Sequence, residues 1–283
     1  MDRKLRVQNA IDKFLKHTLS YRWSSALAVL GVGGLARYGF DNRAQEILPY
    51  DTAVTTLVSF TLVVYQWDSL KDLLANGSEE GKKPVSRRLL ICLCCAILGC
   101  FYSVKLLPLS LYAEMLLGCS LIAFYFLPLK IVRRLLDRIL IVRWVFLSTL
   151  IGGAGVLIGG SGEQISAKLP LLIPMICGNL VVCDYRDRSE DLQNPNRTGY
   201  SGDRKHVFRD LTLLFVISLV ALFGISYFHD LAIKPWIFAN MLSFGLLIVA
   251  SGLDRWPWRL TLIADLALFA AAITLAVNQP SSV

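Results

Sequence analysis

The sequence is poor in histidine and contains no cysteine pattern typical of a bound metal. Its histidines, His17, His206 and His229, fall in polar segments without ligand partners nearby in the sequence. No CxxC…CxxC arrangement occurs, which argues against a Cys/His zinc site. The cysteines all lie in or at the edge of apolar stretches, so we expect them to be small packing residues rather than disulfides: Cys92, Cys94, Cys95, Cys100, Cys119, Cys177 and Cys183.

A secretory signal peptide is also missing from the start of the sequence. Residues 1–20 are charged and amphipathic, with neither an apolar core nor a small-residue cleavage site. Basic residues surround Val7, Ile11, Phe14 and Leu15 at helical spacing. We therefore expect residues 1–20 to form an amphipathic helix that lies on the membrane surface.

Long polar stretches are scarce, and apolar runs dominate instead. Hydrophobic residues make up 55% of the 283 positions, and the mean hydropathy is +0.54. Many runs approach about 20 residues, the length that spans a bilayer. The predicted fold class is all-α, a polytopic membrane protein with nine transmembrane helices. We expect a single membrane domain over 1–283, with the bundle at 21–283 and spans at about 23–38, 52–70, 89–107, 109–127, 139–160, 168–187, 207–228, 233–252 and 258–277.

The net charge of +8 does not indicate nucleic acid as a partner, because the basic residues cluster in short loops between apolar spans. Nine spans divide these loops very unequally between the two sides of the membrane. Of the 29 Lys and Arg residues, one side holds only Arg37, Arg43, Lys105, Lys168 and Lys234. This asymmetry predicts an integral membrane protein, with the lipid bilayer as a partner and the N-terminus on the cytoplasmic side.

Two groups of carboxylates mark the ends of apolar runs, both on the predicted cytoplasmic side. Asp184, Asp187 and Asp191 follow the run 169–183 at i, i+3 and i+7. At roughly 100° per residue they share one helix face. Asp68 and Asp72, at i and i+4, end the run 52–67. Like charges on one face repel one another and are costly to desolvate, so divalent cations would compensate them. Two such faces, rimmed by Arg and Lys, suit Mg²⁺ held against a diphosphate.

The second of these groups resembles a motif of the UbiA superfamily of intramembrane prenyltransferases. The stretch Asp184-Tyr-Arg-Asp187-Arg-Ser-Glu-Asp191, followed by Asn196-Arg197-Thr198, is similar to the DYRDxxxD…(K/R)T form that the family carries at the end of its sixth helix. This match is the most specific one in the chain.

The first acidic group resembles the family's other motif, NxxxDxxxD, at the end of its second helix. The chain keeps DxxxD at Asp68 and Asp72, but Val64 replaces the Asn. Lys83-Pro84 stands where Arg-Pro is common, and 125–130 resembles the family's Tyr-x-x-Pro and basic loop after helix four. Since Val64 has no donor atom, we expect the first metal site to be the weaker one.

The resemblance implies a Mg²⁺-dependent enzyme that ionises a prenyl diphosphate and transfers the prenyl group, an alkyl group other than methyl, to a small-molecule acceptor. It assigns metal binding to Asp68, Asp72, Asp184, Asp187 and Asp191. Diphosphate binding falls to Arg22, Lys83, Lys130, Arg133, Arg134, Arg188 and Arg197, and the candidate catalytic residues are Lys130, Arg134 and Tyr185.

Two other functions stay open at this point. The prenyl cation can be captured by the substrate's own double bonds, which would make the chain a membrane terpene cyclase, and the altered first motif makes this a serious competitor. A non-catalytic lipid-binding or transport protein is the third. The second acidic group can also be a solvated helix end paired with Arg186 and Arg188, and the loop basic residues can serve topology alone. Glu114 and Asp265 are intramembrane acids outside the family's motifs, and such acids are functional candidates by default.

Overall fold

The computed structural model describes residues 23–39, 50–75, 83–106, 112, 116, 120, 139–159, 165–191, 200, 202–229, 233–253 and 257–278. Within those ranges the side chains of 23, 50, 68–75, 83–89, 159, 189–191 and 257–258 are not described. All the elements among the described residues are helical, as the apolar runs of the sequence predict.

The helices coincide closely with the predicted spans. Their bounds are α2 Trp23–Tyr38, α3 Tyr50–Ala75, α4 Lys83–Leu106, α7 Leu140–Ala154, α8 Ile165–Asp191, α9 Arg204–Phe228, α10 Ile233–Ser251 and α11 Pro257–Val277. A π-helical segment, η2 (Gly155–Gly159), continues α7 directly. Each predicted span therefore has a described helix except 109–127, which lies almost wholly outside the described residues, as does the predicted interfacial helix 1–20.

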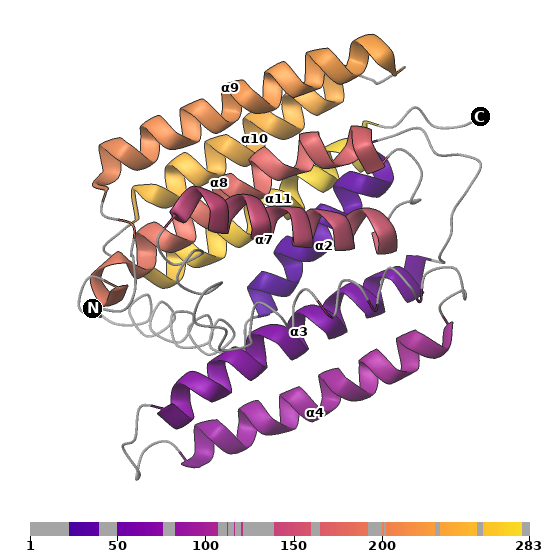
Figure 1. The fold of residues 1–283 in the computed structure, drawn as a ribbon, viewed down its shortest axis with the longest axis vertical. Helices are drawn as coiled ribbons and strands as arrows, with labels where there is room; N and C mark the ends of the chain where they lie inside the picture. The colour runs from indigo at the N-terminus through magenta and orange to yellow at the C-terminus, as the bar shows by residue number, and fades with distance from the viewer. Residues whose placement is uncertain are drawn as a thin grey trace, which may run out of the picture.

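The bundle has a central group of helices between two outer pairs (Figure 1). Helices α2, α7, α8 and α11 form the centre, with α9 and α10 on one flank and α3 and α4 on the other. The largest apolar core lies among α2, α8, α9, α10 and α11. Two smaller apolar clusters join α3 and α4 to α2 and η2. Helix α2 is therefore the link between the two parts of the bundle.

Glycines allow α2 to approach its neighbours closely. A Cβ on Gly31 would lie 2.5 Å from the backbone of Leu268 in α11, and one on Gly34 would lie 2.9 Å from the Cβ of Ala272. On another face of α2, a Cβ on Gly155 of η2 would lie 3.3 Å from the backbone nitrogen of Gly33. Small residues permit such close contact between membrane helices.

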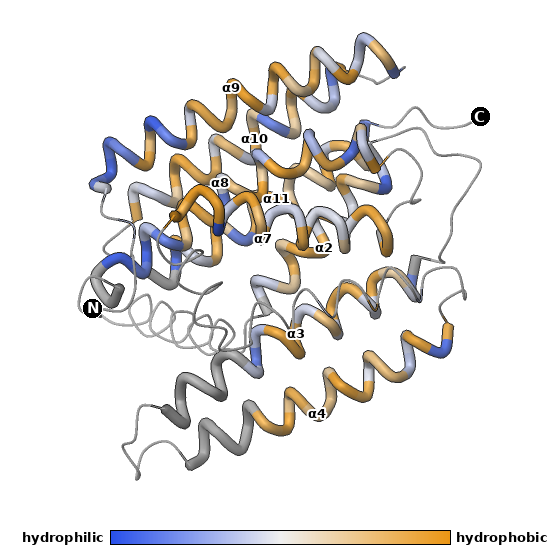
Figure 2. Tube along the Cα trace, in the orientation of Figure 1, coloured by the Kyte–Doolittle hydropathy of each residue, from blue (hydrophilic) through white to orange (hydrophobic). Residues whose placement is uncertain are grey.

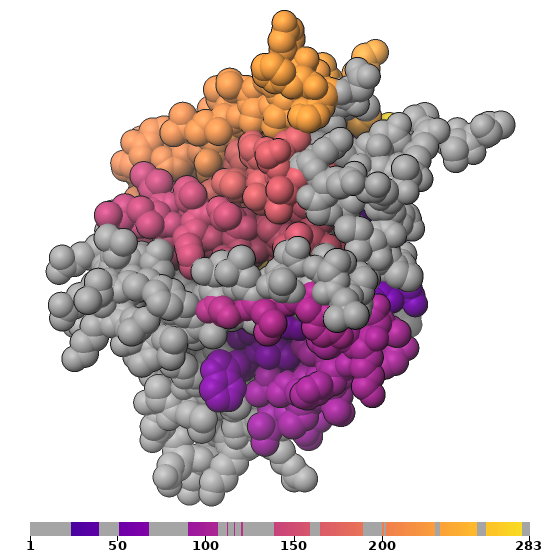
Figure 3. All heavy atoms as spheres, turned by 45° about the vertical axis from the view of Figure 1, so that its right-hand side comes forward, coloured from indigo at the N-terminus to yellow at the C-terminus, as the bar shows by residue number. Residues whose placement is uncertain are grey.

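The outer helices present apolar surfaces to their surroundings. Hydrophilic residues gather toward the helix ends, while the middle lengths are mostly hydrophobic (Figure 2). In Figure 3, α9 and α4 cover opposite edges of the molecule. Their exposed large side chains include Leu213, Val220 and Phe223 on α9, and Leu98 and Phe101 on α4. Exposed apolar faces of this extent suit contact with lipid rather than water.

Five helical segments in the described part of the chain are long and apolar enough to cross a membrane: Leu140–Ile158, Ile165–Arg188, Arg204–Phe228, Ile233–Ser251 and Arg259–Val277. These spans support an integral membrane protein. The count of nine spans and the cytoplasmic orientation of the N-terminus and the Asp-rich motifs stay predictions.

The cysteines only partly follow the expectation from sequence. The described cysteines form no disulfide with one another, and Cys177 is buried. Cys94 and Cys95, however, are exposed on α4, so the structure does not show them as packing residues. Their helix lies at the edge of the bundle and turns much of its apolar surface outward. Cys119 lies outside the described residues.

Candidate functional site

The predicted second acidic group lies where five helices end together. Arg143 near the start of α7 contacts Asp184 near the end of α8, and Arg186 of α8 contacts Thr261 near the start of α11. The start of α9 meets the end of α10 where Arg204 approaches Gly252. We call this the acidic end of the bundle; Figure 1 shows these helix ends on one side of the molecule.

The body of α8 explains why its last turns are held firmly. The helix carries Pro170 and Pro174 in its first half, yet it runs unbroken to Asp191. Most of its apolar side chains from Leu171 to Val182 are buried in the core. Asn179 donates a hydrogen bond of 2.7 Å from Nδ2 to the backbone oxygen of Ala264, which fixes α8 against α11. The acidic turns that follow therefore start from a rigid position.

Asp184 is held by α7 rather than by its own helix. The guanidinium of Arg143 and the indole Nε1 of Trp144, at 2.5 Å, both donate hydrogen bonds to its Oδ2 atom. The side chains of Arg143 and Asp184 are only 15% and 19% exposed, so the ion pair is weakly screened by water. All of these bonds go to Oδ2, which leaves Oδ1 of Asp184 with no hydrogen bond from the described part of the chain.

Asp187 is paired with the preceding residue. Arg186 donates from Nε to Oδ1 and from Nη2 to Oδ2, each at 2.5 Å, in a bidentate arrangement. The third nitrogen, Nη1, donates to Thr261 Oγ1 at 2.7 Å. The carboxylate of Asp187 is 40% exposed while Arg186 is 15% exposed. The alternative pairing from sequence, with Arg186 and Arg188, is thus confirmed for Arg186 and Asp187, whereas Asp184 pairs with Arg143.

Aromatic rings lie directly behind the carboxylates. Tyr185 is buried, and Tyr200 meets it edge-on with ring centroids 6.3 Å apart. Trp144 lies 6.1 Å from the Tyr200 ring. The guanidinium carbon of Arg188 stands 4.4 Å from the Tyr185 ring centroid, a cation–π contact. One face of Tyr185, a candidate catalytic residue, is therefore already covered by a cation.

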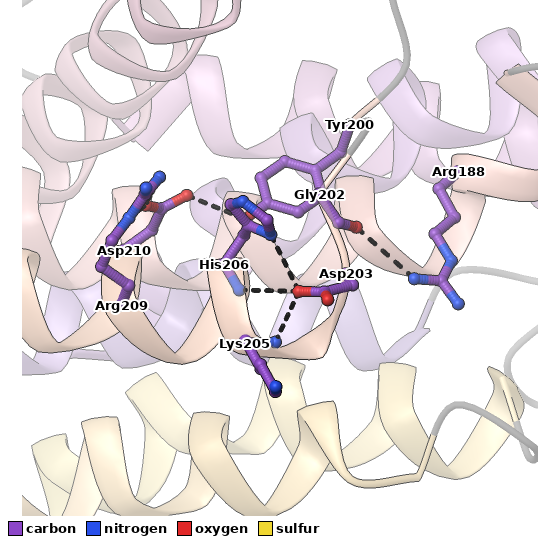
Figure 4. A network of polar contacts seen from close by, with 8 residues as sticks. All are labelled: Arg188, Tyr200, Gly202, Asp203, Lys205, His206, Arg209 and Asp210. Atoms are coloured by element: carbon purple, nitrogen blue, oxygen red, sulfur yellow. Dashed lines mark hydrogen bonds and ion pairs between the residues drawn. The ribbon is translucent and has the colours of Figure 1, made fainter.

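A polar network connects this aromatic cluster to the start of α9 (Figure 4). The Tyr200 hydroxyl donates to Asp210 Oδ2 at 2.8 Å, and Arg188 Nη1 donates to the Gly202 carbonyl at 3.4 Å. Burial and the hydrogen bond to Asp210 raise the pKa of Tyr200, so the phenol stays protonated at physiological pH.

The first turn of α9 is capped by Asp203. Its Oδ1 accepts hydrogen bonds from the backbone N–H groups of Lys205, at 2.9 Å, and His206, at 3.1 Å. The His206 ring lies 2.8 Å from the same oxygen. Hydrogen bonds from the ring and the backbone of His206 lower the pKa of Asp203. The carboxylate therefore stays ionised and satisfies helix-terminal donors that would otherwise lack partners.

The first acidic group lies on the last turns of α3, where the side chains of Asp68 and Asp72 are outside the described set. Just before them, Gln66 is buried and Trp67 is 54% exposed. Figure 1 shows the end of α3 on the same side of the bundle as the end of α8. Helix α2 packs against both helices. The predicted contact between the two motifs falls on undescribed side chains and stays a prediction.

Several other predicted ligands cannot be placed. Arg22, Lys130, Arg133, Arg134 and Arg197 lie outside the described residues. Lys83 begins α4 and Asp191 ends α8, but neither side chain is described. Of the predicted site, the structure thus positions Asp184, Tyr185, Asp187 and Arg188.

Five residues of the acidic end were not among the site residues predicted from the sequence. Arg143 and Trp144 of α7, Thr261 and Asp265 of α11, and Tyr200 all contact or adjoin the α8 residues. Only Asp265, as an intramembrane acid, carried a signal in the sequence. The others reach the site through the packing of distant helices, which no local spacing reveals.

The carboxylate oxygens at the acidic end are of the type that binds divalent cations. Asp184 and Asp187 supply hard oxygens, one helical turn apart and partly exposed, of the type that Mg²⁺ prefers. Among the residues searched in the described ranges, no three acidic, Cys or His residues lie close enough to hold a metal. Asp68, Asp72 and Asp191 lie outside that set of side chains. Asp184 and Asp187 can therefore supply part of a metal site, in which Arg186 would compete with the metal for Asp187.

Comparisons with known proteins do not add a relative from which a role could be transferred. No protein-family model, curated protein or solved structure matches this chain.

Proposed function

We propose that the chain is a Mg²⁺-dependent intramembrane prenyltransferase of the UbiA type, which ionises a polyprenyl diphosphate and transfers its prenyl group to an acceptor. The observation that carries the proposal is the composition of the acidic end. Two partly exposed carboxylates, Asp184 and Asp187, stand there with three guanidinium groups, Arg143, Arg186 and Arg188, at the edge of apolar spans. This composition favours a ligand that is anionic at one end and apolar along its length.

The residues have distinct tasks in this proposal. Asp184 and Asp187 would help to hold Mg²⁺, which when bound would neutralise the diphosphate and make it a better leaving group. Arg143 and Trp144 fix the orientation of Asp184 through Oδ2, so that Oδ1 is the atom left for a ligand. Arg188 rests on Tyr185, where the buried ring supports a cation directed at phosphate oxygens.

The apolar helices contribute by excluding water. A prenyl chain is hydrocarbon, and the spans around the acidic end bury mainly aliphatic and aromatic side chains. A cation formed beside such side chains is protected from premature hydrolysis. Apolar burial of the chain would also supply most of the affinity for the substrate, at about 0.8 kcal/mol per CH₂ group.

The test is turnover by the purified protein. Prenyl diphosphates of several lengths are incubated with Mg²⁺, with and without a panel of aromatic acceptors, and products are followed by mass spectrometry. We expect Mg²⁺-dependent release of diphosphate and a prenylated acceptor. A cyclised hydrocarbon formed without acceptor would instead establish the terpene cyclase. Absence of diphosphate release from every substrate, or undiminished release in EDTA, would refute both enzymes.

Two matched Asp→Asn variants distinguish loss of a site carboxylate from a general effect of the substitution on the protein. Asp187→Asn removes an anionic oxygen at the acidic end, and we expect at least a hundredfold loss of turnover. Asp51→Asn makes the same chemical change in the first turn of α3, where the carboxylate is exposed. The control should keep wild-type turnover. Equal activity of both variants would remove Asp187 from the mechanism.

A further inference from the structure

A buried carboxylate that the proposed mechanism does not use lies beside Arg186. Asp265 of α11 is 3% exposed, and its Oδ2 accepts a hydrogen bond of 3.4 Å from the Ser25 hydroxyl of α2. It follows Thr261 by four residues, so both side chains lie on one face of α11. Thr261 in turn accepts the hydrogen bond from Arg186 Nη1. Asp265 therefore adjoins Arg186 at the junction of α2, α8 and α11.

Arg186 consequently stands between two carboxylates at different depths. On the exposed side, Asp187 is 40% exposed and accepts two of its hydrogen bonds. On the buried side, the negative charge of Asp265 also acts on the guanidinium. A guanidinium has five N–H donors in a fixed fork. The bonds to Asp187 and Thr261 use three of these N–H groups, one on each nitrogen. This leaves donors for a second acidic partner.

The arrangement matters because Arg186 and a divalent cation would compete for Asp187. Arg186 donates a hydrogen bond to each of its oxygens, and its positive charge repels a metal ion there, so the metal binds more tightly if the guanidinium withdraws. A partly buried arginine that withdraws from its sole counterion becomes an unpaired charge, which is strongly unfavourable. A second carboxylate within reach removes that penalty.

We propose that Asp265 is a positioning residue that retains Arg186 when Asp187 binds a divalent cation. The guanidinium turns from Asp187 toward Asp265, and Thr261 stays its fixed acceptor. No bond is made or broken apart from hydrogen bonds. The inference rests on the proposed function, since it concerns the same metal site. It also explains why an acid lies buried within α11, far in sequence from the two Asp-rich motifs.

The experiment measures metal binding without turnover. Mn²⁺, a paramagnetic substitute for Mg²⁺, is titrated into purified protein, and electron paramagnetic resonance reports the free ion. We expect Asp265→Asn to weaken Mn²⁺ binding by about tenfold, a coupling of ordinary size between interacting sites. Asp265→Glu, which keeps the charge, should restore most of the affinity. Thr261→Val should weaken binding by a smaller factor because it removes only the neutral acceptor.

Two controls distinguish positioning from loss of stability. Asn240→Ala removes a buried hydrogen bond to Ser218 between α9 and α10, away from Arg186. It should lower the melting temperature yet leave Mn²⁺ affinity unchanged. The double variant Arg186→Gln/Asp265→Asn removes the competing cation, so it should bind more tightly than Asp265→Asn alone. This recovery is specific to a competition for Asp187.

The outcomes are decisive in either direction. Wild-type affinity in Asp265→Asn, or an equal loss in Asn240→Ala, overturns the positioning role while the proposed metal site stands. If the double variant binds Mn²⁺ as weakly as Asp265→Asn does, the positioning role is also overturned. If wild-type protein binds no Mn²⁺, the metal-dependent function and the positioning role fail together. If Asp265→Asn does not fold, Thr261→Val decides, and wild-type affinity in that variant refutes the proposal.

Discussion

Replacing Gly31 with alanine should separate α2 from α11. The added Cβ would lie 2.5 Å from the backbone carbon of Leu268 and 2.5 Å from the backbone nitrogen of Phe269. Carbon atoms in contact prefer about 3.5–4.0 Å. Because the obstructing atoms belong to a helix backbone, no side-chain rotation can relieve the overlap. One helix must therefore move by roughly 1 Å, which disturbs the packing along the whole interface.

The magnitude follows from two opposing effects. Alanine is favoured over glycine in a helix interior by about 1 kcal/mol, while forcing extra volume into a packed interface costs about 1–3 kcal/mol. Contact with backbone places Gly31→Ala at the upper end, so we expect a net loss of about 1–2 kcal/mol. The Ser25–Asp265 hydrogen bond also joins these two helices and would lengthen with their separation.

Gly245→Ala is the matched control, because a Cβ at Gly245 of α10 meets nothing within 4 Å. That variant gains the helix preference without the overlap and should be stabilised by up to about 1 kcal/mol. Thermal unfolding of both variants in one detergent, followed by intrinsic tryptophan fluorescence, should separate their midpoints by roughly 4–12 °C. A Gly31→Ala midpoint equal to or above that of Gly245→Ala would refute the close packing of α2 on α11.

Three further predictions concern the helix ends. The folded-state pKa of Asp203 is lowered, so its capping of α9 is present at neutral pH and is lost as pH falls through that pKa. Hydrogen exchange of the amides in the first turn of α9 should become less protected in wild type at that low pH. In Asp203→Ala the same amides should be poorly protected at every pH. The pKa of Tyr200 is raised in the folded protein, so above a pH of about 10 the tyrosine ionises first in the unfolded chain, and the stability of the folded protein falls. In Tyr200→Phe the free energy of unfolding should therefore decline less steeply with rising pH. The same variant should lose about 0.5–1.5 kcal/mol of stability with the hydrogen bond to Asp210. On a cysteine-free background, single cysteines at Asn76 and Gln164 should be labelled from opposite sides of the membrane, and labelling from one side would exclude nine spans.

The sequence was sufficient to predict the helices because apolar runs and bilayer thickness constrain them strongly. For α8 it also located the acidic turns at 184–187, since an apolar run that ends in carboxylates marks a membrane boundary. It could not predict that Asp184 turns to Arg143 and Trp144. That choice depends on how α7 is rotated against α8, and the rotation is decided by packing among several helices.

Tyr185 illustrates the same limit at a single residue. The family resemblance makes it a candidate catalytic residue, but Tyr185 is only 2% exposed. The reason is Tyr200, which follows α8 by several residues and returns to cover the ring. A contact between a helix end and a later segment leaves no periodic trace in the sequence. Long-range contacts of this kind explain why the site was only partly foreseen.

The contrast between α8 and α9 has a consequence for how the protein enters the membrane. In α8, 67% of the span is buried within the protein, whereas in α9 the figure is 17%. Helix α8 also carries two prolines and, near its start, the fully buried Lys168, features that are unfavourable in direct contact with lipid. Helix α9 can leave the translocon directly into lipid. Helix α8 gains its contacts with α9, α10 and α11 only when these later helices have been synthesised, so the acidic end is completed only after α11 has inserted.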